Sequence, residues 1–150
     1  MSLKDGTKKM SKSDPSELSR INLNDDKDSI INKIKKAKTD SLPIPDSIEE
    51  LQKRPEAENL LGIYSSLNNQ ILQQTLDEFS GKNFSDFKKK LSDLLIEKIT
   101  PVSLKMKEIQ KDNKFIDDIL KQGAEKADKI ASKKVDEIKK IIGFWINFNL

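Results

Sequence analysis

Apolar residues recur at intervals of three and four along most of this chain, which predicts a series of amphipathic helices. In the first predicted helix, Ile30, Ile31 and Ile34 share one side, and lysines surround them. Pro55 precedes a later run with this spacing and suits the first position of a helix. In the first half of the chain we expect helices at residues 29–38, 47–53, 56–67 and 70–79.

The longest apolar periodicity starts near residue 85 and runs through Pro101. A proline inside a helix removes one backbone donor and clashes with the carbonyl four residues earlier, so we expect a kink or a break there. A short helix over 115–121 is predicted to stop at Gly123 in a left-handed conformation. The last helix is predicted over 124–142.

The two ends of the chain differ in polarity. Residues 1–19 are polar and are predicted to form a loop with one helical turn after Pro15. At the other end, Gly143 is predicted to terminate the last helix, and the apolar residues 144–150 are expected to dock on the domain. These patterns predict an all-α fold, a helical bundle preceded by a loop.

The composition agrees with helices and excludes several other classes. The 150 residues are 35% charged and 35% apolar, whereas aromatic residues make up only 5%, which argues against a β-sandwich or barrel. No apolar run is long enough to cross a membrane, and the polar start predicts no signal peptide. The absence of cysteine removes disulfides and thiolate metal sites, which suits a cytoplasmic protein.

The net charge of +3 is small for 28 basic and 25 acidic side chains. Only Arg20 and Arg54 are arginines, whereas a surface that reads bases more often presents arginine forks. Most lysines are therefore expected on solvated helix surfaces. One cluster near the end of the first predicted helix suits the helix dipole, with contact to an RNA backbone as the alternative. The cluster comprises Lys33, Lys35, Lys36 and Lys38.

The chain contains no histidine, which excludes a Ser-His-Asp triad, a histidine-ligated metal and an imidazole base. The glycines stand at positions 6, 62, 81, 123 and 143, too scattered for a dinucleotide-binding fingerprint or a Walker motif.

The five residues from Lys9 to Ser13, Lys-Met-Ser-Lys-Ser, place two lysines three apart and two hydroxyls beside them. Each ammonium offers three donors and each hydroxyl offers one, which is the chemistry that binds phosphate. Loop-forming residues flank this unit, so its side chains can converge on one ligand. A solvated lysine loop is the alternative interpretation.

This unit resembles the KMSKS signature of class I aminoacyl-tRNA synthetases, and its flanks match too, namely residues 1–3, residues 5–8 and Asp14-Pro15. Further segments resemble bacterial tryptophanyl-tRNA synthetases more closely than the tyrosyl enzymes, and the likeness spans nearly the whole chain. These segments are residues 33–40, 54–56, 59–65, 123–127, 130–131 and 142–144. The final residues depart from the short tail that the family leads us to expect.

The resemblance implies that the loop closes over the phosphates of ATP. Lys9 and Lys12 would be catalytic, because they would neutralise the charge that builds on the departing pyrophosphate. The implied ATP-binding residues are Lys9, Met10, Ser11, Lys12, Ser13 and, less specifically, Leu3 near the adenine. The resemblance implies ATP with Mg²⁺ in the full-length enzyme, no metal ligands in this chain, and no cofactor for this chain alone.

The resemblance also implies partners and a division into domains. Residues 1–19 would be the loop segment that ends the catalytic domain, and residues 20–150 would form the helical domain that binds the tRNA anticodon. The implied partners are tRNA(Trp), together with ATP and tryptophan through the catalytic half. The full-length enzyme is expected to be a homodimer, this chain a monomer, and neither associates with a membrane.

Without histidine, the second class I signature, HIGH, cannot lie in this chain, so we expect the chain alone to be inactive in adenylate formation. Two alternatives to a synthetase portion remain. One is a non-catalytic helical tRNA-binding module that retains the loop as a relic. The other is a plain helical interaction domain with an accidental motif.

Overall fold

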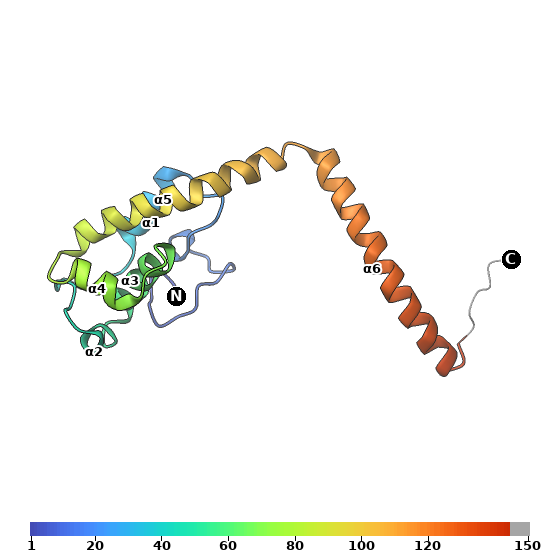
Figure 1. The fold of residues 1–150 in the computed structure, drawn as a ribbon, viewed down its shortest axis with the longest axis horizontal. Coiled ribbons are helices and arrows are strands. Elements are labelled where there is room, and N and C mark those ends of the chain that lie inside the picture. Colours follow the sequence, from blue (N-terminus) through green and yellow to red (C-terminus); the bar gives the residue numbers. More distant parts are fainter. Residues whose placement is uncertain (145–150) are drawn as a thin grey trace. The chain divides into compact units, whose positions relative to one another are not determined.

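The computed structural model describes residues 1–144, and within them it is helical without strands, as predicted for an all-α fold (Figure 1). The chain divides into two compact units, Met1–Met106 and Lys107–Leu150. The predicted boundary between residues 19 and 20 stays a prediction, and residues on both sides of it lie in the first unit. The elements are the 3-10 helix η1 (Glu17–Ser19) and the helices α1 (Lys27–Lys36), α2 (Ile48–Leu51), α3 (Pro55–Leu67), α4 (Leu72–Phe79), α5 (Phe84–Ile109) and α6 (Asn113–Ile141).

Local signals explain where these helices start and stop. The Asp26 side chain caps α1 by accepting from the Ser29 amide, and Pro55 occupies the first turn of α3. Gly81 has a φ of 71° and makes the turn between α4 and α5. The four helices predicted for the first half of the chain are therefore confirmed, with ends that move by at most a few residues.

The core of the first unit is a cluster of aromatic rings contributed by three helices. Tyr64 of α3 meets Phe79 of α4 at 5.0 Å between ring centroids, and Phe79 meets Phe87 of α5 at 4.9 Å. Figure 1 shows α3 and α4 beside the first half of α5, which is the arrangement that these ring contacts require. Edge-to-face packing stabilises such a cluster beyond the apolar area that it buries.

The predicted break at Pro101 is wrong, because α5 continues through this residue; a kink there stays a prediction. Ile99 and Ser103 lie four residues apart on one face of this helix, and both are buried. Pro101 itself is exposed, so water can satisfy the carbonyl that loses its helical donor. The fixed φ of proline is itself helical, which limits the cost.

The predicted stop at Gly123 is also wrong, because α6 runs through it as one helix. Glycine inside a helix costs only about 1 kcal/mol relative to alanine, so it does not end a helix that its neighbours favour. Gly143, with a φ of 74°, does follow the end of α6, as predicted. The expected docking of the tail concerns residues 144–150, of which only the exposed Phe144 lies within the described residues.

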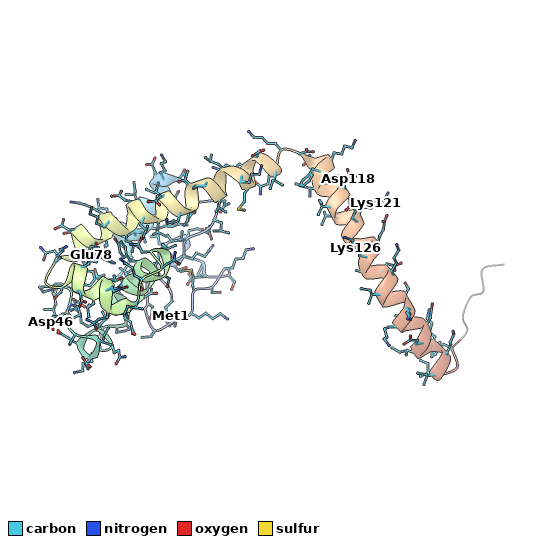
Figure 2. All side chains as sticks on the ribbon, in the orientation of Figure 1. Met1, Asp46, Glu78, Asp118, Lys121 and Lys126 are labelled. Carbon is cyan, nitrogen blue, oxygen red and sulfur yellow. The ribbon has the colours of Figure 1, made fainter. Side chains whose placement is uncertain are left out.

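Helix α6 has no buried residue, although its sequence is amphipathic. Figure 2 shows the side chains of Asp118, Lys121 and Lys126 projecting from this helix. The Asp112 side chain caps its first turn by accepting from the Phe115 amide at 2.9 Å. Within residues 1–144, no helix combines the length and the apolar character that crossing a membrane would require.

Candidate functional site

The segment before the Lys9–Ser13 loop is anchored in the core by Leu3, which is 1% exposed. The Leu3 amide donates to the Ser19 carbonyl at 2.9 Å, and the Lys38 amide donates to the Leu3 carbonyl at 2.7 Å. The Ser2 amide donates to the Lys8 carbonyl at 2.8 Å and closes a tight loop. The base of the loop is therefore held on both sides by backbone hydrogen bonds.

Gly6 brings this tight loop against the start of α3. A Cβ at this position would lie 2.4 Å from the carbonyl carbon and oxygen of Pro55, and 2.6 Å from the Glu56 nitrogen. The Asn59 side chain adds a second attachment, since its amide donates to the Met1 and Ser2 carbonyls at 3.2 and 3.1 Å. Only glycine permits this approach of two backbones.

A groove of about 490 Å³ opens between the two sides of this loop region. It is lined by Ser2, Lys4, Asp5, Lys8, Lys9, Ser11, Ser13 and Asp14. Of the predicted site residues, the structure therefore brings together Lys9, Ser11 and Ser13. Lys12 does not line the groove although it is exposed, and Met10 packs against the hydrophobic core.

The loop holds its two hydroxyls close to each other. The Ser11 and Ser13 hydroxyl oxygens are 3.0 Å apart, and the Ser13 amide donates to the Ser11 hydroxyl at 3.3 Å. Within residues 1–144, neither Lys9 nor Lys12 forms an ion pair or a hydrogen bond. The loop thus presents two unpaired ammonium groups and two neighbouring hydroxyl donors, a set suited to an anion with several oxygens.

The carboxylate of Asp5 sets the charge on the opposite side of the groove. The Thr7 hydroxyl and amide both donate to it, at 2.6 and 3.1 Å, and these bonds lower the pKa of Asp5. The Lys8 ammonium lies 3.3 Å from the same carboxylate. The Asp5 carboxylate therefore neutralises the charge of one lysine, and the residues that line the groove keep a net positive charge.

Sequence reasoning missed the residue that holds the far end of the loop, Arg20. This side chain is 9% exposed, donates to the Asp14 carbonyl at 3.0 Å, and pairs with Glu17. The only signal for it was that arginine is rare in this chain. Lys4 and Lys8 were missed as lining residues, because they stand outside the five-residue motif.

The structure divides the lysine cluster of α1 into structural and exposed members. Lys33 is 5% exposed and its ammonium lies 2.6 Å from the Asp25 carboxylate. Lys38 pairs with Glu56 at 2.7 Å, which raises the pKa of Lys38. Lys35 and Lys36 remain exposed. Among the described residues, no group of three histidine, cysteine or acidic residues could hold a metal ion.

Residues 1–100 match the sequence model of a family described as tRNA synthetases class I (W and Y). The chain is 54% identical over 144 residues to the tryptophan–tRNA ligase of Agrobacterium fabrum, and this match covers 96% of the chain. It is 47% identical over 146 residues to the Rickettsia conorii ligase, covering 97% of the chain. The chain spans 41% and 44% of the lengths of these two relatives.

A solved structure shows the same likeness. The crystal structure of the Mycoplasma pneumoniae tryptophanyl-tRNA synthetase superposes with a TM-score of 0.73 and 26% sequence identity. That match covers 97% of this chain and 45% of the Mycoplasma chain. The described helices are thus the architecture of one part of that structure.

Proposed function

The chain belongs to the class I tRNA synthetases of the tryptophan and tyrosine type, and from this premise we propose that it is the C-terminal part of a tryptophan–tRNA ligase. It supplies the loop that binds the phosphates of ATP and a helical domain that binds tRNA(Trp). The observation that carries this proposal is the groove in which Lys9, Ser11 and Ser13 converge beside unpaired positive charge.

The reaction has two steps, in which ATP and tryptophan first yield an enzyme-bound adenylate and pyrophosphate, and the aminoacyl group then passes to tRNA. The charge on the departing pyrophosphate is stabilised by the Lys9 and Lys12 ammonium groups. Ser11 and Ser13 exchange their mutual hydrogen bond for bonds to phosphate oxygens. Each such contact contributes roughly 3 kcal/mol to transition-state stabilisation, as measured for other preorganised donors.

Lys12 does not line the groove and has no partner within residues 1–144, so it reaches the phosphates by movement of the loop. Loop closure of this kind positions charge without acid–base chemistry, which fits a chain without histidine. Met10 supports ATP binding by anchoring the loop on the core. Leu3 supports it by holding the backbone at the base of the loop.

The remaining parts of the proposal follow from the relatives, which are more than twice as long as this chain. The tryptophan pocket, the HIGH signature and the nucleotide-binding sheet lie in the region of the relatives that the chain does not cover. In the complete ligase, ATP binds together with Mg²⁺. The complete ligase acts as a homodimer in the cytoplasm, and this chain alone is a monomer that forms no adenylate.

The decisive experiment uses a chimera in which this chain replaces the matching region of the Agrobacterium fabrum ligase. We expect tryptophan-dependent ATP–pyrophosphate exchange from the chimera and none from the chain alone. Lys9→Ala and Lys12→Ala should each lower kcat by about 100-fold or more. Lys53→Ala, which removes an exposed lysine outside the groove, is the matched control. Unchanged exchange in both loop variants would refute the catalytic assignment.

Binding of tRNA by the chain alone tests the second part of the proposal and separates the alternatives. Titration with salt, comparing tRNA(Trp) with a non-cognate tRNA, should show affinity that falls steeply as salt rises. Salt-sensitive binding together with an inactive chimera would favour a tRNA-binding module with a relic loop. No binding and an inactive chimera would favour a plain interaction domain.

A further inference from the structure

A second groove, of about 520 Å³, lies between α1 and the start of α5, and the candidate site above does not use it. Its walls combine the apolar side chains of Ile31 and Phe84 with the basic side chains of Lys35, Lys88 and Lys89. Grooves of several hundred Å³ with a mostly apolar lining and a few convergent polar groups are typical of ligand sites.

The most unusual group in this groove is the half-buried ammonium of Lys88. It donates to the Ala37 carbonyl at 2.7 Å and to the Thr39 hydroxyl at 3.0 Å, both of which are neutral acceptors. Within residues 1–144, no carboxylate forms an ion pair with Lys88. Burial lowers the pKa of Lys88.

An ammonium has three donors, so Lys88 retains one for a further acceptor. A charge that is partly withdrawn from water is stabilised most by an anion with oxygen acceptors. The two neighbouring lysines, Lys35 and Lys89, add positive charge around the same cavity. The structure therefore favours an anionic ligand next to Lys88.

Two carboxylates lie near this groove and limit its charge. Asp93 lines the groove, and Asp86 lies outside the lining and is 3.6 Å from the Lys89 ammonium. Lys35 and Lys88 form no ion pair within the described residues, so the groove keeps an excess of positive charge. Ser85, in the first turn of α5, places a hydroxyl at the same cavity, near the positive end of the helix dipole.

The apolar side of the groove favours a nucleotide over a bare phosphate, because a phosphate ion has no apolar surface to place against it. Ile31 is 45% exposed although it is a large aliphatic residue, and it faces the groove from α1. Aromatic and other apolar side chains can hold the flat face of a base that has left its stack, and single-stranded RNA loops present unstacked bases. An acidic peptide would satisfy the lysines but would not need this wall.

We propose that the groove between α1 and α5 binds one unpaired nucleotide of an RNA, with its phosphate at Lys88 and its base against Ile31. The proposal rests on the tRNA-binding function proposed above, because it names one point of contact within that surface.

The first test uses NMR of the full 150-residue chain, titrated separately with adenosine 5′-monophosphate, adenosine and inorganic phosphate. The nucleotide should shift the Ile31 methyl and Thr39 amide resonances saturably, with an affinity at least fivefold above that of nucleoside or phosphate. Absence of saturable shifts at these residues would overturn the proposal. Phosphate binding as tightly as the nucleotide would also overturn it, because the apolar wall would then contribute nothing.

Variants of the groove make the test specific. Lys88→Met keeps the apolar stem but removes the charge, and it should weaken nucleotide binding at least tenfold. Lys88→Arg, which keeps the charge, should retain affinity within a few-fold, and Lys53→Met is the control outside the groove. If Lys88→Met unfolds at the wild-type temperature and still binds the nucleotide with wild-type affinity, the assignment of the phosphate to Lys88 is refuted.

The tRNA measurement separates failure of this inference from failure of the proposed function. Loss of one phosphate contact should reduce the slope of log affinity against log salt by about 0.7 to 0.9 in Lys88→Met. If the wild-type chain binds tRNA and Lys88→Met binds with the same slope, the groove proposal fails while the proposed function stands. If the chain binds no tRNA but the nucleotide saturates the groove, the proposed function fails and the site stands. Displacement of the nucleotide by polyglutamate at equal or lower concentration would identify an acidic-peptide site and overturn the RNA assignment.

Discussion

Replacement of Gly6 by alanine tests whether the contact between the loop base and α3 holds the phosphate-binding groove in place. The new Cβ would lie 2.4 Å from two backbone atoms of Pro55. Backbone at the start of a helix cannot turn aside as a flexible side chain can. Restoring a normal carbon contact therefore requires the loop to retreat from α3 by about 1 Å.

The loss of stability caused by this retreat follows from the contacts that it disturbs. Overpacking of this kind typically costs about 1 to 3 kcal/mol, and the Asn59 bonds to the Met1 and Ser2 carbonyls would lengthen as the loop moves. For a unit of about 100 residues, this corresponds to a fall in Tm of roughly 5 to 15 °C. A displacement of about 1 Å of the groove lysines should lower exchange activity of the chimera on the order of 100-fold.

Gly62→Ala is the matched control, because nothing lies within 4 Å of a Cβ at this position in α3. Alanine has the higher helix propensity, so Gly62→Ala should raise the stability by up to about 1 kcal/mol and leave exchange unchanged. Thermal unfolding by circular dichroism and ATP–pyrophosphate exchange by the chimera measure the two effects. Native Tm and native exchange in Gly6→Ala would show that the loop does not depend on this close approach.

Three further predictions concern charges that the tertiary structure removes from water. Asp25→Ala should lower the free energy of unfolding by about 3 kcal/mol in urea denaturation, because it removes the closer of the two carboxylates that pair with the buried Lys33 ammonium and leaves only Glu17 at 3.9 Å. The double variant with Lys33→Met should recover most of this loss, and no recovery would refute the reasoning. Because the pKa of Lys88 is lowered in the folded chain, the unfolded chain binds more protons than the folded chain between the folded pKa and 10.5. The free energy of unfolding should therefore rise with pH in this range. Lys88→Met should abolish the rise. The bond from Arg54 lowers the pKa of Asp40, so its contribution is present above 3.8 and lost as pH falls through the folded pKa. Because the Asp40 side chain is still 38% exposed, solvent screens its pair with Arg54. Asp40→Asn should therefore change acid stability by less than about 1 kcal/mol, and a larger change would contradict this reasoning.

The helices of the first half of the chain could be predicted closely because their apolar periodicity agrees with their caps. Of the isoleucines predicted to share one side, Ile30 and Ile34 are buried, whereas Ile31 is 45% exposed. The turn at Gly81 has the left-handed conformation that glycine favours. The break expected at Pro101 and the stop expected at Gly123 are wrong for one reason. Proline and glycine each disfavour a helix locally, but a helix continues when the residues on both sides favour the helical conformation more strongly.

The donors that the loop offers and the all-α class follow from the order of the residues. The order Lys-Met-Ser-Lys-Ser sets which donors are available, and periodicity sets which face of each helix is apolar. Both are properties of neighbouring residues, so they can be recognised without knowing what packs against them.

Which of these groups can act depends on how the helices pack. The packing has three consequences of this kind. It placed Gly6 against Pro55, removed Lys33 from the surface, and left Lys88 partly buried without an anionic partner. Each of these outcomes depends on a residue that is distant along the chain or on the solvent that packing excludes. Close approach and desolvation arise from the three-dimensional packing of helices, which local periodicity does not specify.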